Sequence, residues 1–210
     1  MSLFQPIRVL IVDDHPVVRV GMKTIINQQP DMAVVAEAKD GPSALEAFRQ
    51  FHPDVALMDV RLPGRSGIQA TAAIVAEFPK ARVLVVSNYD GDEDIYQALQ
   101  AGASGYLFKS ILEDEILNAI RGVHAGQRYL PRSVTRRLDE RTGPTRLTQR
   151  EKDILDVLGK GFSYKELANL MGVSTETVRT HVKNLFRKLN VSDRAEALRE
   201  ALHRGFLHLD

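Results

Sequence analysis

Acidic side chains follow two short apolar runs of the sequence. Ile7–Val12 is followed by Asp13 and Asp14, and Val55–Met58 is followed by Asp59. The unbroken apolar run Val55–Met58 is typical of a strand that is buried on both faces of a parallel sheet, and Ile7–Val12 is strand-like apart from Arg8. Because ligands of such sheets gather outside the carboxyl ends of the strands, these carboxylates stand where a binding site is expected. Taken alone, an Asp in this position can equally begin a turn.

Two further apolar runs end in side chains that complement carboxylates. Val83–Val86 is followed by Ser87, and Gly105–Phe108 is followed by Lys109. If the first and third strands are neighbours, three carboxylates meet, and they repel one another unless a cation joins them. An oxygen-only ligand set without His or Cys favours Mg²⁺, with Mn²⁺ or Ca²⁺ as alternatives. Taken singly, Ser87 also fits a helix cap and Lys109 a solvated charge, but five such positions on successive strands argue against coincidence.

These side chains together permit one specific reaction. A carboxylate can attack phosphorus and form an aspartyl phosphate. A metal ion and Lys109 would neutralise charge on the phosphoryl group, and Ser87 offers it a hydroxyl donor. Asp59 follows the central strand, so we predict that Asp59 is the nucleophile and that Asp13 and Asp14 hold the metal.

The first 124 residues repeat a strand and a helix five times. Besides the four runs above, Met32–Ala36 is expected to be a strand. Amphipathic helices are expected from Pro16 to Ile26, from Asp40 to Phe51, after Gly67 to Phe78, over Asp92–Ala101 and over Leu112–Val123. Five such units predict an α/β fold with a parallel sheet and helices on both faces, in the flavodoxin-like order 2-1-3-4-5.

This arrangement resembles the receiver domain of two-component response regulators over roughly residues 6–124. The resemblance extends to Pro63-Gly64 after the acceptor and to Ala101–Tyr106 before the lysine. It implies that Asp59 takes a phosphoryl group from a phosphohistidine of a sensor histidine kinase, with Mg²⁺ required. It also implies that the backbone carbonyl of Arg61 completes the metal shell.

The sequence departs from the family pattern at two positions, and the resemblance suggests a conformational switch on phosphorylation. Ser87 stands where Thr is commoner, and Ser110 follows Lys109 where many receivers have Pro. A phosphoryl group brings roughly −1.5 to −2 charges. Ser87 would swing toward it and vacate space for Tyr106, although an ordinary half-buried strand aromatic is an alternative interpretation of Tyr106.

Charge divides the chain. Residues 1–124 carry 11 Lys and Arg against 16 Asp and Glu, whereas residues 125–210 carry 17 against 11. A basic half favours a polyanionic partner. Residues 125–144, with their Arg, Thr, Pro and Gly, are expected to be a linker before a domain at 145–210. The absence of Cys, of a signal peptide and of a long apolar run favours a cytoplasmic protein without a membrane partner.

The basic half shows helical periods alone. Thr148 and Glu151 form the sequence pattern of a capping box, and Ser163 begins a second helix. Gly172 permits a tight turn, and Ser174 caps a third helix that continues to Leu189. Two short helices around a Gly-containing turn describe a helix-turn-helix. A fourth helix follows and offers a dimer face.

The third helix of this half has one apolar and one basic face. The apolar face, expected to pack inward, comprises Val178, Val182, Leu185 and Leu189. Roughly residues 145–207 resemble the LuxR-type DNA-binding domain through Leu147–Glu151, Lys165–Ala168 and Val173–Val182. By position, the resemblance implies base reading by Arg179, Thr180 and Lys183. It implies phosphate contacts for Thr175, Thr177, Asn184, Arg187 and Lys188. A merely solvated helix surface is the alternative.

We therefore predict a phosphorylation-controlled transcription regulator of the NarL/FixJ subfamily, not an enzyme with a separate substrate. Its expected partners are a sensor kinase, promoter DNA with two half-sites and a second copy of itself on phosphorylation; RNA polymerase is a further candidate. One alternative is a regulator whose receiver is a phosphate-independent dimerisation platform. A Mg²⁺-dependent phosphohydrolase and a small-molecule sensor are others, but short βα loops leave little room for a substrate pocket.

Overall fold

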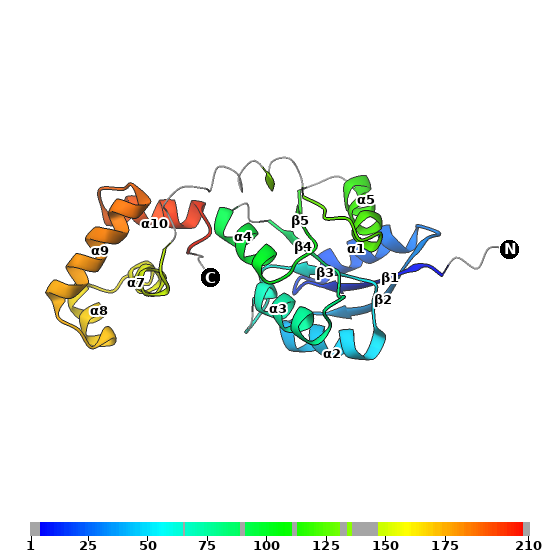
Figure 1. The fold of residues 1–210 in the computed structure, drawn as a ribbon, viewed down its shortest axis with the longest axis horizontal. Coiled ribbons are helices and arrows are strands. Elements are labelled where there is room, and N and C mark those ends of the chain that lie inside the picture. The colour runs from blue at the N-terminus through cyan, green and yellow to red at the C-terminus, as the bar shows by residue number, and fades with distance from the viewer. Residues whose placement is uncertain are drawn as a thin grey trace. The chain divides into compact units, whose positions relative to one another are not determined.

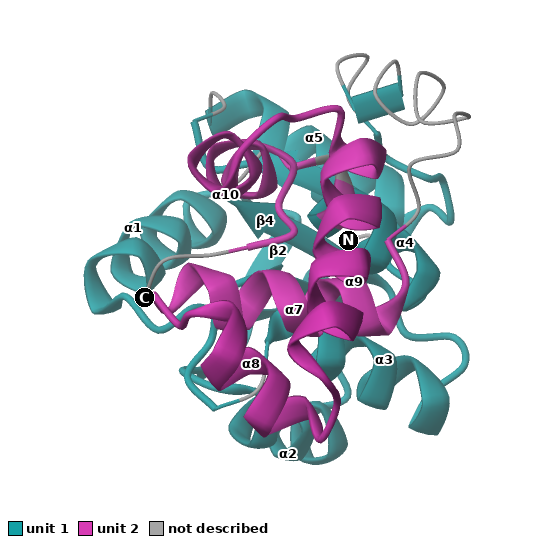
Figure 2. Cartoon of the chain, turned by 90° about the vertical axis from the view of Figure 1, so that its left-hand side faces the viewer, with its two compact units in different colours: residues 1–89, 94–135 teal, residues 90–93, 136–210 magenta. Residues whose placement is uncertain are grey.

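A computed structural model describes residues 5–64, 66–88, 91–110, 113–130, 134–135 and 147–207. The chain divides into two compact units, residues 1–89 with 94–135 and residues 90–93 with 136–210 (Figure 2). None of the described helices has the length and apolar character that crossing a membrane requires.

The first unit contains a five-stranded parallel sheet in the order β2-β1-β3-β4-β5, as predicted. The strands are β1 (Ile7–Val12), β2 (Met32–Ala38), β3 (Val55–Asp59), β4 (Val83–Ser87) and β5 (Gly105–Phe108). β2 is two residues longer than expected because Ile11 and Val12 of β1 pair with Glu37 and Ala38. Asp59 and Ser87 are themselves the last residues of their strands, so the sheet holds both backbones.

Helices cover both faces of the sheet (Figure 1). They are α1 (Pro16–Asn27), α2 (Gly41–Phe51), α3 (Gly67–Glu77), α4 (Asp92–Gln100) and α5 (Glu113–His124). α1 and α5 pack on one face, where Ile26 and Ile120 join β1 and β3 in one apolar core. α2 and α3 lie on the opposite face. Asp40 caps α2 in a capping box with Ser43, which fixes the helix start that the sequence indicated.

The outer edge of β5 is covered by the chain that follows α5. The backbone amide of Tyr106 donates to the Tyr129 carbonyl, and the amide of Tyr129 donates to the Ser104 carbonyl, both at 3.1 Å. A side chain at Gly105 would have no room, since a Cβ there would lie 2.5 Å from the Tyr129 oxygen. The start of the predicted linker is therefore attached to the sheet, and an edge open to intermolecular pairing is closed.

The second unit is helical. Its described helices are α7 (Gln149–Gly159), α8 (Tyr164–Met171), α9 (Thr175–Leu189) and α10 (Arg194–His203). The predicted caps are present: Thr148 with Glu151 for α7, Ser163 for α8 and Ser174 for α9. Gly172 turns between α8 and α9 with a φ of 65°. The four apolar side chains predicted to face inward from α9 are buried in the core of this unit.

Candidate functional site

The sheet brings the predicted acidic residues together at the carboxyl ends of β1 and β3. Asp13 and Asp59 are almost fully buried. Lys109, which follows β5, reaches both of them: its Nζ atom lies 2.6 Å from Asp13 Oδ2 and 2.6 Å from Asp59 Oδ2. The Lys109 backbone is held in place because its amide donates a hydrogen bond of 2.8 Å to the Ser87 carbonyl. The adjacency of β1 and β3 thus creates the cluster, as the order 2-1-3-4-5 predicted.

Burial sets the electrostatics of this cluster. Burial raises the pKa of Asp59 above its ordinary value, and the hydrogen bond from Lys109 offsets this only in part. For Lys109, burial alone would lower the pKa, but hydrogen bonds to Asp13 and Asp59 outweigh burial and raise it. Lys109 is therefore a fixed cation at neutral pH. Two carboxylates share this one cation, so the cluster keeps an excess of negative charge.

The donor atoms fit a divalent cation. Asp13, Asp14, His15 and Asp59 each offer one atom to a group whose atoms all lie within 4.8 Å of one another. Asp14 Oδ1 is inaccessible to solvent, and the Nδ1 atom of His15 lies 2.7 Å away but outside hydrogen-bond geometry. A buried carboxylate oxygen without a donor is costly unless a cation satisfies it. Acidic oxygens of this kind are the ligands that Mg²⁺ takes in proteins.

His15 was not among the metal ligands predicted from the sequence, because that set contained oxygen donors alone. Its Nδ1 atom lies 2.7 Å from Asp14 Oδ1 and 3.2 Å from Asp13 Oδ1. The sequence did contain a signal, because His15 directly follows the two acids and precedes a proline that starts α1.

The remaining predicted residues of the first unit lie on or directly after strands of the same sheet: Arg61 follows β3, Ser87 ends β4 and Tyr106 lies on β5. The Arg61 amide lies 3.3 Å from Asp59 Oδ1, so the chain turns back over the carboxylate there. The Ser87 side chain is buried. Tyr106 is fully buried as well, and its ring meets Phe108 edge-on at a centroid distance of 5.8 Å. The inward position that we expected Tyr106 to reach on phosphorylation is thus the one that this structure already shows.

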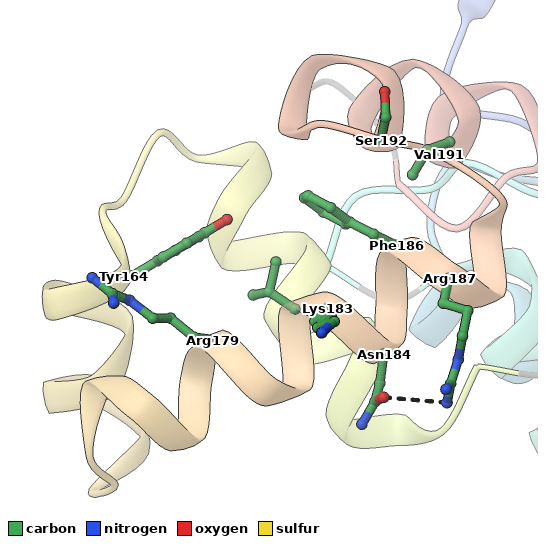
Figure 3. A pocket seen from close by; sticks show the side chains of 9 residues that line it. Tyr164, Arg179, Lys183, Asn184, Phe186, Arg187, Val191 and Ser192 are labelled. Atoms are coloured by element: carbon green, nitrogen blue, oxygen red, sulfur yellow. Dashed lines mark hydrogen bonds between the residues drawn. The ribbon is translucent and has the colours of Figure 1, made fainter.

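In the second unit, α9 presents a basic row beside a hollow. Arg179, Lys183 and Arg187 recur every four residues and are exposed. They line a hollow of about 480 Å³ (Figure 3). Its other lining residues are Tyr164, Val182, Asn184, Phe186, Val191 and Ser192. Two cations of the predicted base-reading set and one of the phosphate set therefore share one concave surface, which favours a polyanion.

The other predicted DNA-contacting residues differ in how much of their side chain is available. Thr180 is exposed, and its hydroxyl donates to the Glu176 carbonyl at 3.1 Å. Thr177 is exposed too, while Thr175 at the helix start is half-buried. Lys188 turns away from the basic row, because its Nζ atom lies 2.7 Å from the largely buried carboxylate of Glu151.

Asn184 has an internal partner as well. Its side-chain oxygen accepts a hydrogen bond of 3.2 Å from Arg187 (Figure 3). Tyr164 and Ser192 were not predicted from the sequence, because they come from α8 and from the loop before α10. Neither position has a periodic relation to α9, so tertiary structure alone brings both to the hollow.

The two units match two known families. Residues 9–121 match the response regulator receiver domain, and residues 145–201 match bacterial regulatory proteins of the luxR family. The oxygen regulatory protein NreC of Staphylococcus carnosus (strain TM300) is 37% identical over 214 residues, which cover 95% of this chain and 99% of that protein. The transcriptional regulatory protein DegU of Brevibacillus brevis is 33% identical over 224 residues, which cover 96% and 95% of the two chains.

A solved structure agrees with these matches. The response regulator ChrA of a heme-sensing two-component system is 36% identical, with 96% of this chain and 99% of that chain covered and a TM-score of 0.57. Members of this family pair with histidine kinases and bind DNA, and they are not typical enzymes. The resemblance found in the sequence is therefore confirmed: the chain belongs to the two-component response regulators of the NarL type, phosphorylation-controlled transcription regulators that join a receiver domain to a LuxR-type DNA-binding domain.

Proposed function

We propose that Asp59 is the residue that receives the phosphoryl group, and that this event controls promoter binding by α9. The observation that carries the proposal is the pair of contacts from Lys109 to Asp13 and Asp59, since it places one fixed cation beside the carboxylate at the end of β3. An Asp59 oxygen forms the new P–O bond as the N–P bond of a kinase phosphohistidine breaks, and the kinase imidazole leaves with the electron pair of the broken bond.

Each neighbour of Asp59 has a defined part in this proposal. Asp13, Asp14, Asp59 and the Arg61 carbonyl would hold Mg²⁺, or Mn²⁺ in its place, and the ion would supply charge neutralisation at the phosphoryl oxygens. Lys109 leaves its contact with Asp59 Oδ2 and pairs with the incoming phosphoryl group. Ser87 donates a hydrogen bond to that group, and the buried Tyr106 ring retains the conformation in which Ser87 points inward.

The DNA-binding half acts through the basic row of α9. Arg179, Thr180 and Lys183 read base edges in the major groove, where an Arg or Lys pairs with guanine. Arg187, Thr175, Thr177 and Asn184 contact phosphates, and they set the orientation of the helix on the duplex. Lys188 contributes a weaker phosphate contact than the exposed cations do, because Glu151 already neutralises it. The regulator is cytoplasmic and binds two half-sites as a dimer that forms on phosphorylation, and RNA polymerase is its partner at the promoter.

Phosphorylation of Asp59 is tested by intact mass. The full chain is incubated with Mg²⁺ and a small phosphodonor, and mass and oligomeric state are recorded together. We expect the wild type to gain the mass of one phosphoryl group and Asp59→Asn to gain none. Asp114→Asn, a control on the exposed first turn of α5, should gain the same mass as the wild type. Equal uptake by Asp59→Asn would move the acceptor elsewhere. Uptake without dimerisation would favour release of the DNA-binding half instead.

The base-reading role of Lys183 is tested by titration with operator and unrelated DNA. Lys183→Ala should weaken specific binding by about 1–3 kcal/mol and reduce discrimination between the two DNAs. Lys160→Ala is the matched control, because Lys160 is also exposed but lies outside the hollow and pairs with Asp156. An unchanged operator preference in Lys183→Ala would contradict the base-reading role. A parallel loss of both affinities would reduce Lys183 to a phosphate contact.

A further inference from the structure

The imidazole of His15 does not cap the helix that it precedes. His15 is the N-cap residue of α1, yet its side chain makes no capping hydrogen bond, and Pro16 removes one of the amides that a cap would serve. The side chain is 64% exposed. Its backbone is fixed nevertheless, because the His15 amide donates to Asp13 Oδ1 at 2.8 Å, and the ring Nδ1 lies within hydrogen-bond distance of the same oxygen, at 3.2 Å. The ring therefore contacts the carboxylates and makes no capping bond to the helix.

Lys109 leaves one side of the acidic cluster available. It occupies Oδ2 of Asp13 and Oδ2 of Asp59. The other oxygen of Asp13 and Oδ1 of Asp14 face His15, and Asp14 Oδ1 has no hydrogen-bond donor of proper geometry among the described residues. A cation can thus reach two carboxylate oxygens and one imidazole nitrogen while Lys109 stays in place.

The separations between these atoms are those of neighbouring metal ligands. With metal–ligand bonds of about 2.1 Å, adjacent ligands of an octahedron lie about 3.0 Å apart. Nδ1 lies 2.7 Å from Asp14 Oδ1 and 3.2 Å from Asp13 Oδ1, so the two observed separations bracket this value. Both separations from Nδ1 are therefore compatible with His15 sharing an ion with either carboxylate.

We propose that His15 is a direct ligand of the divalent cation at this site, through Nδ1, and that it widens the choice of metal beyond Mg²⁺. The inference rests on the proposed function, because it uses the same acidic site. An imidazole contributes little to Mg²⁺ binding, which is satisfied by oxygen, but it strengthens binding of Mn²⁺, Co²⁺, Ni²⁺ and Zn²⁺. The affinities of this site for different divalent cations therefore differ more than those of a cluster of three carboxylates would.

The test compares the affinities of Ni²⁺ and Mg²⁺ in the full chain. Tag-free protein is titrated calorimetrically with each metal at pH 8, where an ordinary imidazole is neutral. Three variants are compared with the wild type: His15→Ala, His15→Gln and His52→Asn. His15→Gln keeps a polar side chain of similar reach but lacks the imidazole nitrogen. His52→Asn is the control, because His52 lies in the same unit with a φ of 44°, a conformation that Asn tolerates.

We expect both His15 variants to lose Ni²⁺ affinity by about 10-fold or more while their Mg²⁺ affinity changes less than about threefold, and we expect His52→Asn to match the wild type. A second readout is the ¹⁵N spectrum of the histidine rings, in which Zn²⁺ should shift Nδ1 of His15 specifically. Unchanged thermal unfolding of the variants excludes a folding defect, as the exposure of His15 leads us to expect.

The outcomes separate this inference from the proposed function. If the His15 variants keep the wild-type ratio of Ni²⁺ to Mg²⁺ affinity, His15 is not a ligand, although Asp59 remains the acceptor. If the wild type binds neither metal and takes up no phosphoryl group, the acidic site itself has been misinterpreted, and both statements fail together.

Discussion

Gly67, the first residue of α3, should be intolerant of any side chain. Its amide donates to the Val60 carbonyl at 2.8 Å, which pulls the helix start onto the end of β3. A Cβ built at Gly67 would overlap the Asp59 carbonyl oxygen and would lie 3.1 Å from Met58 Cγ. Neither the β3 backbone nor the buried Met58 can yield without disturbing the sheet. Gly67→Ala should therefore both destabilise the first unit and displace the carboxylate at the acceptor site.

The size of the effect follows from overpacking. Inserting a methyl group into a well-packed interior costs about 1–3 kcal/mol. With a urea dependence of about 2 kcal/mol/M, this corresponds to a lower midpoint by roughly 0.5–1.5 M. Gly21→Ala is the matched control, since Gly21 lies inside α1 and a Cβ there would meet nothing within 4 Å. The same chemical change should stabilise the unit by about 0.5–1 kcal/mol at that position, because Ala favours a helix interior more than Gly does.

The assay is urea unfolding of the full chain followed by circular dichroism, together with the mass gain from a small phosphodonor. The two substitutions should shift the transition of the first unit in opposite directions, and only Gly67→Ala should slow phosphoryl uptake. Equal midpoints for Gly67→Ala and the wild type would refute the reasoning, because they would mean that the helix start can move away from β3 at no cost. Reduced uptake in Gly21→Ala would show that the assay does not isolate the site.

Further predictions concern pH and ion pairs. The pKa of Asp59 is raised in the folded protein, so ionised Asp59 lowers the free energy of unfolding above that pKa. This destabilisation disappears as the pH falls and the carboxyl group becomes protonated in both states. Asp59→Asn should therefore raise the urea midpoint at pH 7 but not near pH 3. Glu151 shows the reverse sign: burial would raise its pKa, but Lys188 and Thr148 lower it below 4.5. Glu151→Gln should therefore destabilise the second unit at pH 7, and the difference should close as the pH falls through the lowered value, as thermal unfolding at several pH values would show. Arg187→Ala should reduce the salt slope of DNA binding by about 1, measured from affinities at several salt concentrations.

Local patterns predicted the elements well because each was specified by neighbours in the chain. The capping box of Thr148 and Glu151 and the left-handed turn at Gly172 formed where the sequence placed them. The apolar runs became the strands, since a strand buried on both faces leaves no other pattern. The end of β2 was placed two residues early, because its length depends on pairing with β1 rather than on its own composition.

Contacts across the fold were harder to predict. Nothing in the spacing of Lys188 indicated Glu151, which lies two helices away and turns this predicted phosphate contact toward the core. Tyr164 and Ser192 reached the hollow beside α9 for the same reason. The inward ring of Tyr106 also required the structure, because the sequence fits a fully buried and a half-buried strand aromatic equally well.

The sequence by itself determined the order of the elements, the acidic residues at the strand ends and the basic row of α9. These are consequences of periodicity and residue type, which act over a few neighbouring residues. Only the tertiary structure decided which atoms meet. Lys109, which follows β5, shares its charge between Asp13 and Asp59 because β1 and β3 are adjacent in the sheet.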